Sequence, residues 1–307
     1  MNIVLDLNSN TISNTISNNE VTARNDNAIS LVIVSKYTIS NNNLISKNDN
    51  GIYLAASSHN TISNNNISAE DYSIHLLSSS GNNTFLNNNI TANNSKIMHR
   101  ETGGGLTNTL IYNNSYGEVK WFDKTDLSIN ESGTIGLGTA INISNNSIVV
   151  DSAGYNNDDG SGLNQSANLT FFGVSITGFA TAFRNGEDCG DVCGDVTNVS
   201  DTYYFNVSQF TNYSVGYIVD CGDTITSSTT LTTNLTCSGD GIVIGADDVV
   251  LDCDGYTINY STSGTSGYGI NNSGGYDNVT IKNCNIVEGN ATGNNKNGIY
   301  FDNADNG

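Results

Sequence analysis

The chain has 307 residues, no proline, only 13% charged residues and a formal net charge of −20 at pH 7. Only 10 Lys and Arg stand against 30 acidic residues, and none of the basic residues cluster as phosphate binding requires, which argues against a nucleic-acid partner. No run reaches the roughly 18 apolar residues of a membrane-spanning helix, so we expect no membrane span in this chain.

A six-residue phrase recurs near the start of the chain at intervals of 23 residues. Its copies are Asn14–Asn19, Tyr37–Asn42, Asn60–Asn65 and Asn83–Asn88. A period in the twenties without helical spacing predicts a solenoid, whose repeats bury their apolar residues only against neighbouring repeats.

Three apolar groups return at nearly the same place in each period. They alternate with Ser, Thr or Asn, which predicts short strands with one buried face. Three strands and three bends per period predict a right-handed parallel β-helix, with like residues stacked at about 4.8 Å per coil. The groups are Ile16, Ile39, Ile62 and Phe85; Val21, Leu44, Ile67 and Ile90; and the pairs Ile29/Leu31, Ile52/Leu54 and Ile74/Leu76.

An Asn pair marks the first bend of each period. Asn tolerates left-handed backbone and its amides can bond along a stack, so we interpret the Asn excess as structural. The absence of proline fits strands in which every N–H is needed for the ladder. Regular coils are expected to about Asn114, with a loop insertion near residues 102–105.

Beyond the coils, residues 117–218 carry longer alternating runs separated by Gly, Asp and Asn turns. They predict a few last coils and a small antiparallel, β-sandwich-like module in the position of a cap. From Val219 the three-strand pattern returns with steps of 29–30 residues, as from Val249 to Val279 and from Ile270 to Ile299. We therefore predict an all-β chain with coils in 1–116, the cap module in 117–218 and a second parallel β-helix in 219–307.

Two sets of segments together carry a family resemblance. Those of the second solenoid are Cys221–Asp223, Leu231–Cys237, Gly241–Ile244, Val250–Ile258 and Asn278–Cys284, and those of the module are Leu163–Thr170, Phe205–Ser208 and Tyr213–Val215. They resemble archaeal right-handed β-helix surface proteins of the NosD-like or CASH type (carbohydrate-binding proteins and sugar hydrolases). The resemblance covers most of the chain and implies the fold more than the function.

The order of parts is the end of one solenoid, a module and the beginning of another. A tandem protein, or a protomer that joins copies of itself head to tail, has this order, because uncovered coils expose strand edges and apolar residues. We therefore expect an extracellular structural or adhesive cell-surface protein that forms a filament or stalk. The alternative is a carbohydrate-binding or polysaccharide-cleaving protein, with extracellular carbohydrate as its partner.

Six cysteines allow fifteen pairings, and their spacing favours three. Cys189 and Cys193 are four residues apart, Cys221 and Cys237 sixteen, and Cys253 and Cys284 fall on adjacent coils at disulfide distance. A metal site is the rival for Cys189 and Cys193, but no second Cys pair or His matches it.

Asn-x-Ser/Thr sequons occur 18 times, only modestly more often than this composition produces by chance. With the cysteines they indicate an extracellular chain carrying N-glycans. The first six residues lack the regions of a secretion signal, which suggests a segment or processed form. The sequon residues are Asn66, Asn82, Asn89, Asn93, Asn113, Asn130, Asn142, Asn145, Asn164, Asn168, Asn198, Asn206, Asn212, Asn234, Asn259, Asn271, Asn278 and Asn290.

A polysaccharide lyase or hydrolase needs clustered carboxylates and a base. The candidate acids are Asp158–Asp159, Glu187–Asp188, Asp247–Asp248, Asp252 and Asp254, with Lys120 and Arg184 as bases. None recurs at coil spacing with another, so we predict no catalytic site and no cofactor. Calcium at Asp158–Asp159 is the weak exception, because those residues lack the alternating ligands of a calcium loop.

Histidines and aromatic residues offer two further sites to weigh. The histidines are His59, His75 and His99. His75 and His99 are 24 residues apart and can lie on adjacent coils, and both are predicted at the surface. Trp121, Phe122, Phe171 and Phe172 have the ring faces that stack on sugars, but aromatic residues in such a module more often form its core.

Overall fold

A computed structural model describes residues 13–77, 80–93, 97–100, 108–122, 129, 133–155, 162–176, 180–290 and 297–305. The chain forms two compact units. Unit 1 comprises residues 1–175 and 182–215, and unit 2 comprises 176–181 and 216–307. Among the described residues, no helix combines the length and apolar character that crossing a membrane requires. The loop insertion predicted at 102–105 lies outside the described residues.

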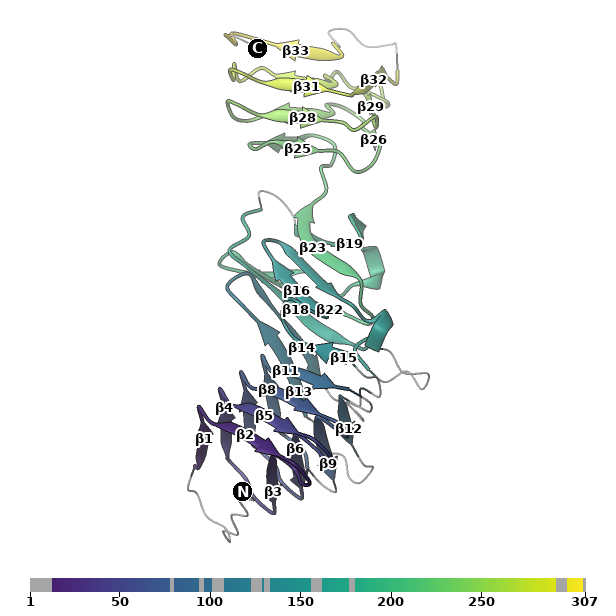
Figure 1. The fold of residues 1–307 in the computed structure, drawn as a ribbon. Helices are drawn as coiled ribbons and strands as arrows, with labels where there is room; N and C mark the ends of the chain where they lie inside the picture. Colours follow the sequence, from purple (N-terminus) through teal and green to yellow (C-terminus); the bar gives the residue numbers. More distant parts are fainter. Residues whose placement is uncertain are drawn as a thin grey trace. The chain divides into compact units, whose positions relative to one another are not determined.

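Unit 1 begins with coils of three short parallel strands, as predicted (Figure 1). The first ladder holds β1 (Thr15–Ser17), β4 (Thr38–Ser40), β7 (Thr61–Ser63), β10 (Thr84–Leu86) and β13 (Thr109–Asn113). The second holds β2 (Glu20–Ala23), β5 (Asn43–Ser46), β8 (Asn66–Ala69) and β11 (Asn89–Ala92), and ends on the antiparallel β15 (Gly133–Ile135). The third holds β3 (Ile29–Val32), β6 (Ile52–Ala55), β9 (Ile74–Leu77) and β12 (Met98–Arg100).

The predicted apolar stacks are confirmed in register. Ile16, Ile39, Ile62 and Phe85 follow one another along the first ladder. Ile39, Ile62 and Phe85 are fully buried, because each is covered on both sides by its neighbours in the stack. The hydrophobic interior of unit 1 therefore comes from residues 23 positions apart, as the period predicts.

The Asn pairs have two separate roles at the first bend. The first member of each pair has positive φ, between 50° and 58° at Asn18, Asn41, Asn64 and Asn87. The second member turns inward and bonds the next coil: Asn65 Oδ1 accepts from the backbone N and from Nδ2 of Asn42, both at 2.9 Å. The left-handed bend and the amide column predicted from the sequence are both present.

An antiparallel module continues from the coils within unit 1. Strand β14 (Gly117–Phe122) pairs antiparallel with β13 and is followed in the same sheet by β18 (Ala167–Phe172), β22 (Thr202–Val207) and β21 (Thr197–Val199). A second sheet has the order β16 (Ile141–Ser144), β17 (Ser147–Val150), β23 (Asn212–Tyr217), β19 (Ala180–Arg184) and β20 (Glu187–Asp188). Two 3₁₀ turns, η1 (Ala153–Tyr155) and η2 (Gly190–Val192), complete the elements described in this region.

Aromatic residues form the core of this module. Trp121 and Phe171 are at most 1% exposed, and Trp121 Nε1 donates to the backbone oxygen of Leu163 at 3.1 Å. Phe171 stacks on Phe205 with 5.7 Å between ring centroids. Because these rings are covered, Trp121 and Phe171 have no face open to a sugar.

Unit 2 contains the second set of parallel coils (Figure 1). One ladder holds β24 (Asp223–Ile225), β27 (Ile242–Ile244), β30 (Ile270–Asn272) and β33 (Ile299–Phe301). The others hold β25 (Thr229–Thr230), β28 (Val250–Asp252) and β31 (Thr280–Lys282), and β26 (Leu235–Thr236), β29 (Thr257–Tyr260) and β32 (Asn285–Glu288). Leu251, Ile258 and Ile270 are fully buried in its core.

Close approach between coils requires glycine at Gly269. A Cβ there would lie 2.4 Å from the backbone oxygen of Gly298 and 2.4 Å from Ile286 Cγ2, so the neighbouring coil leaves no room for a side chain. Gly241 is in the same position one coil earlier, where a Cβ would meet the oxygen of Gly269 at 2.2 Å. The recurring Gly-Ile start of these strands is therefore a packing requirement.

Candidate functional site

Asp247 and Asp248 lie at a turn of unit 2, where both carboxylates bond the next coil. Asp247 Oδ1 accepts from the backbone N of Asp277 at 2.8 Å, and Asp248 Oδ1 accepts from Asn278 Nδ2. Asp277 in turn accepts from the backbone N of Asp305. Among the described residues, no two of the predicted candidate acids stack on one another from coil to coil. Asp247 instead forms a column with Asp277 and Asp305, at steps of 30 and 28 residues, which was not predicted from the sequence.

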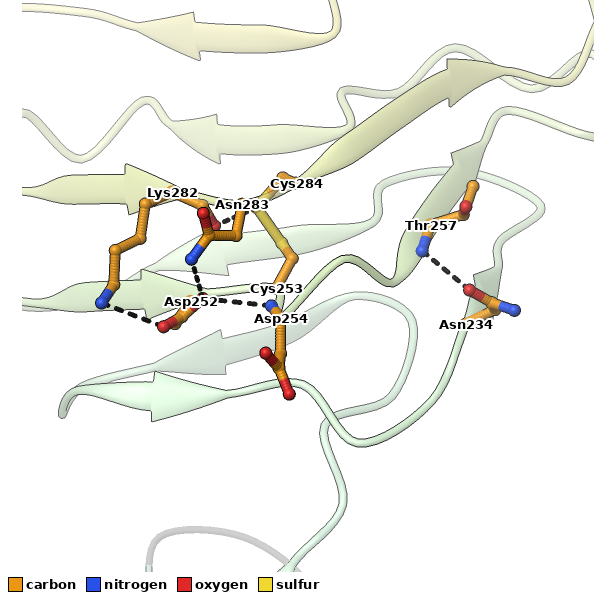
Figure 2. The surroundings of a disulfide bond; sticks show 8 residues. All are labelled: Asn234, Asp252, Cys253, Asp254, Thr257, Lys282, Asn283 and Cys284. Atoms are coloured by element: carbon orange, nitrogen blue, oxygen red, sulfur yellow. Dashed lines mark hydrogen bonds and ion pairs between the residues drawn. A yellow bond between two sulfur atoms is a disulfide. The ribbon is translucent and has the colours of Figure 1, made fainter.

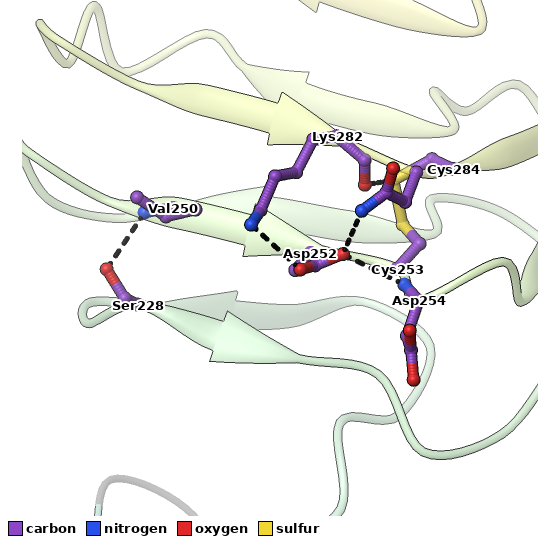
Figure 3. A network of polar contacts seen from close by, with 8 residues as sticks. Ser228, Val250, Asp252, Cys253, Asp254, Lys282 and Cys284 are labelled. Carbon is purple, nitrogen blue, oxygen red and sulfur yellow. Dashed lines mark hydrogen bonds and ion pairs between the residues drawn. A yellow bond between two sulfur atoms is a disulfide. The ribbon is translucent and has the colours of Figure 1, made fainter.

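Asp252 is the centre of a polar network on the outside of unit 2 (Figures 2 and 3). One carboxylate oxygen forms an ion pair with Lys282 Nζ at 2.9 Å, and the other accepts from Asn283 Nδ2 at 2.9 Å and from the backbone N of Asp254 at 3.1 Å. These hydrogen bonds, from Asn283 first and then Lys282, lower the pKa of Asp252 to about 2. Asp252 therefore stays ionised and acts as an acceptor, not as a proton donor.

The low pKa of Asp252 predicts a stability loss in acid. Because the folded-state pKa lies below the ordinary 3.8, the contribution is present above that value and is lost as pH falls from about 4 toward about 2. In the double variant Lys282→Met, Asn283→Ala, we expect the pKa to return toward 3.8 because both side-chain donors are gone. Carboxyl ¹³C NMR titration measures it, with Lys47→Met as the control in which the pKa of Asp252 stays near 2. An unchanged pKa in the double variant would contradict the assignment.

The remaining candidate acids and bases lie in unit 1. Glu187 is in strand register with Arg184 across the β19–β20 hairpin, and Asp188 Oδ1 accepts from the backbone N of Gly190 at 3.1 Å. Lys120 lies on β14, in register with Asn168 of β18. Asp158 and Asp159, the weak calcium candidate, lie outside the described residues.

Three surface grooves differ in their charged groups. The first, about 680 Å³, is lined by Arg24, Lys47 and Glu70 on the coils of unit 1. The second, about 610 Å³, has Asp191 and the Cys189–Cys193 loop at its edge. The third, about 650 Å³, contains Asp220 and Asp223 at the start of the second solenoid.

The two carboxylates of the third groove cap a turn. Asp223 Oδ2 accepts from the backbone N of Asp220 at 2.8 Å, and Asp220 Oδ1 accepts from the backbone N of Cys221 at 2.7 Å. Each carboxylate is thus engaged by the backbone of its own turn, which stabilises the local structure.

The structure forms three disulfides in the pairing that the spacing favoured. Cys189 joins Cys193, Cys221 joins Cys237 and Cys253 joins Cys284, with Cα separations of 5.7, 5.3 and 4.7 Å. The Cys253–Cys284 bond connects adjacent coils beside the Asp252 network (Figure 2). No cysteine is free, so none is available as a thiolate ligand.

The histidines differ in how exposed their side chains are. His59 is exposed. His75 is only half-buried, so it is not a simple surface residue: its ring lies 5.4 Å from that of Tyr53 and 4.7 Å from that of Tyr72. His99 is in register with His75 on the next strand, and its side chain is outside the description.

The sequon asparagines differ in whether the side-chain nitrogen, Nδ2, donates a hydrogen bond. Asn66, Asn89 and Asn93 are exposed, but each donates Nδ2 to a side chain one coil earlier. In the antiparallel module, Asn168 donates Nδ2 to Asn206 Oδ1 on the neighbouring strand β22 at 3.2 Å. Other sequon residues are exposed and donate no hydrogen bond from Nδ2 within the described residues. They are Asn142, Asn145, Asn198, Asn206, Asn212 and Asn234, whereas Asn130 lies outside the description.

Residues 2–120 match the family model described as "Periplasmic copper-binding protein (NosD)". That is a parallel β-helix family, in agreement with the coils of unit 1. No curated protein and no solved structure matches the chain. Together with three disulfides, which form in oxidising compartments, the match indicates a periplasmic or extracellular protein.

The copper named in the family description does not fit the residues seen in this chain. Copper sites use His, Cys and Met donors gathered around one point. In the described parts of the chain no three His, Cys, Asp or Glu side chains gather in this way, and every cysteine is in a disulfide. We therefore derive no function through copper.

Proposed function

We propose that this protein is a non-catalytic structural or adhesive glycoprotein of the cell surface, a building block of a head-to-tail filament or tandem stalk. The observation that carries the proposal is the use of polar side chains for stacking. The buried Asn columns of unit 1 and the Asp247–Asp277–Asp305 column of unit 2 bond one coil to the next. Side chains used in this way give a stiff rod whose length grows with the number of coils.

The acidic residues support this function over catalysis. A general acid or base needs a pKa near the working pH and an open path to substrate. Asp252 instead has a pKa of about 2 and is held by Lys282 and Asn283. Asp247 and Asp248 are each occupied by a donor from the following coil.

Two measurements separate the structural function from the alternative. We expect electron microscopy with specific antibodies to find the protein in filaments or stalks on native cells. We also expect no cleavage of acidic polysaccharides with calcium present. Cleavage that is lost in the variant Asp247→Asn, Asp248→Asn and kept in Asp26→Asn would overturn the proposal in favour of a polysaccharide-cleaving enzyme. Retention of polysaccharide without cleavage would favour the carbohydrate-binding alternative.

We expect glycan occupancy to be lower at a sequon Asn whose Nδ2 already donates a hydrogen bond, because the N-glycan is attached to Nδ2. Asn168 and Asn206 form a matched pair on neighbouring strands: Asn168 donates Nδ2 to Asn206 Oδ1, while Asn206 makes no donation of its own within the described residues. We expect higher occupancy at Asn206 than at Asn168, measured by mass spectrometry of glycopeptides from native material. Equal or reversed occupancy would contradict a role of the folded structure in selecting acceptors.

A further inference from the structure

The second surface groove, of about 610 Å³, has a glycosylation acceptor in its wall. Asn206 and Ser208, the first and third residues of the sequon Asn206-Val207-Ser208, both line this groove. Asn206 is exposed on β22, and its Nδ2 donates no hydrogen bond within the described residues. A glycan attached to this side chain thus begins inside the groove.

The amide of Asn206 is held in one orientation by the neighbouring strand. Asn168 on β18 donates its Nδ2 to Asn206 Oδ1 at 3.2 Å. Because the oxygen and nitrogen of an amide lie on opposite sides of Cγ, an Oδ1 turned toward β18 places Nδ2 on the side away from β18. On that side of β22 lies Gly194, whose backbone N donates to the backbone oxygen of Asn206 at 2.9 Å.

Residues 191–194 form the wall that Nδ2 faces. The Cys189–Cys193 disulfide closes the loop that carries them. Gly194 leaves space beside the acceptor, since even a Cβ there would lie only 3.4 Å from the backbone N of Asn206. Val192 is 51% exposed, so its aliphatic side chain gains from an apolar group laid against it.

Polar groups of the same groove have unused hydrogen-bonding capacity. Within the described part of the chain, the carboxylate of Asp191 accepts no hydrogen bond, and the hydroxyls of Ser166 and Ser208 form none. A carboxylate accepts from hydroxyl groups, while Ser hydroxyls both donate and accept. One aliphatic side chain among several such groups suits a sugar, which has apolar faces and many hydroxyls.

The attachment at Asn206 decides which sugar occupies the groove. Its volume lies within the range of about 300 to 1,000 Å³ that small-molecule sites have. A glycan linked to the wall is held beside the groove at an effective concentration of about millimolar, so weak contacts are enough to seat it. A free saccharide has no such advantage.

We propose that this groove holds the first sugars of the N-glycan on Asn206. An N-acetylhexosamine packs its acetyl methyl group against Val192 and donates hydroxyl hydrogen bonds to Asp191. This inference rests on the proposed function as a glycoprotein and assigns one of its glycans a fixed place on the fold. The docked glycan covers the loop of the Cys189–Cys193 disulfide.

Enzymatic release of the glycan from folded protein tests the docking. The probe is the full-length chain secreted from eukaryotic cells, in which N-acetylglucosamine is the first sugar. Asn198 is the matched control, because its sequon Asn198-Val199-Ser200 has the same residue types and it is exposed without lining the groove. With a glycan-releasing amidase and mass spectrometry, we expect release several-fold slower at Asn206 than at Asn198, and equal rates after unfolding.

Obstructing the groove tests the assigned contact. We expect Val192→Arg to raise the rate of release at Asn206 to that at Asn198 and to leave the rate at Asn198 unchanged. Val32→Arg is the control, since Val32 is 46% exposed on β3, outside this groove, and should leave both rates unchanged. Fluorescence of the buried Trp121 confirms that both variants are folded. Nuclear Overhauser contacts between the Val192 methyl groups and the acetyl methyl group are expected in the unsubstituted protein alone.

The outcomes separate this inference from the proposed function. Equal rates of release from the folded protein, or a difference that persists in Val192→Arg, would overturn the docking and leave the structural function standing. Native protein without a glycan on Asn206 would overturn the docking at its premise. Antibody labelling that finds the protein away from the cell surface would overturn the proposed function instead.

Discussion

Replacing Asn65 by alanine is expected to destabilise unit 1 by about 3 to 5 kcal/mol, because it leaves several buried polar groups without partners at once. Asn65 is 1% exposed, and its Nδ2 donates to the Asn88 side chain at 3.0 Å and to the backbone oxygen of Ile39 at 2.9 Å. Its Oδ1 accepts from the backbone N and Nδ2 of Asn42. Water cannot replace these partners inside a packed stack without opening it.

Urea denaturation followed by tryptophan fluorescence measures this loss, since Trp121 is the single Trp of the chain and is buried in unit 1. The matched control is Asn66→Ala, the same change at the next residue. Asn66 is exposed and its ladder bonds compete with water, so we expect a loss of about 0.5 kcal/mol or less. Similar losses in the two variants would show that the buried column is not what holds the coils together.

Removing the Cys253–Cys284 disulfide with paired alanine substitutions is expected to destabilise unit 2 by about 3 to 4 kcal/mol. The bond closes a loop of 31 residues, and without it the unfolded chain gains the corresponding conformational freedom. Cys253 is also fully buried, so its truncation removes packing in the core of the coil. Circular dichroism with limited proteolysis of unit 2 follows the transition.

The fluorescence of Trp121 provides an internal control, because it reports on unit 1 and should keep its transition. Alanine substitution of Cys189 and Cys193 is the matched comparison. That pair lies in unit 1 and is separated by only 4 residues, for which the same loop argument gives about 2 kcal/mol. A shift of the Trp121 transition in the Cys253, Cys284 variant would contradict two separately stabilised units.

The division into units differs from the predicted boundaries, and strand pairing explains the difference. The change of pattern after residue 116 indicated a separate module. In the structure β13 pairs antiparallel with β14, so one sheet runs from the coils into the module and the two form a single unit. This pairing has no signature in the local pattern, because pairing between chain-distant strands depends on where their edges meet.

The 23-residue period by itself determined the coils, the stacked Ile16, Ile39 and Ile62, and the bends at Asn18, Asn41 and Asn64. It could do so because in a solenoid each residue contacts its own counterpart one period away, which makes the tertiary contact periodic in the sequence. Only the tertiary structure decided the rest: the column of Asp247, Asp277 and Asp305, the network that holds Asp252 ionised, and the sheet shared by coils and module. Loops of unequal length shift these partners out of any fixed spacing, so their contacts follow from how the coils pack and not from the period.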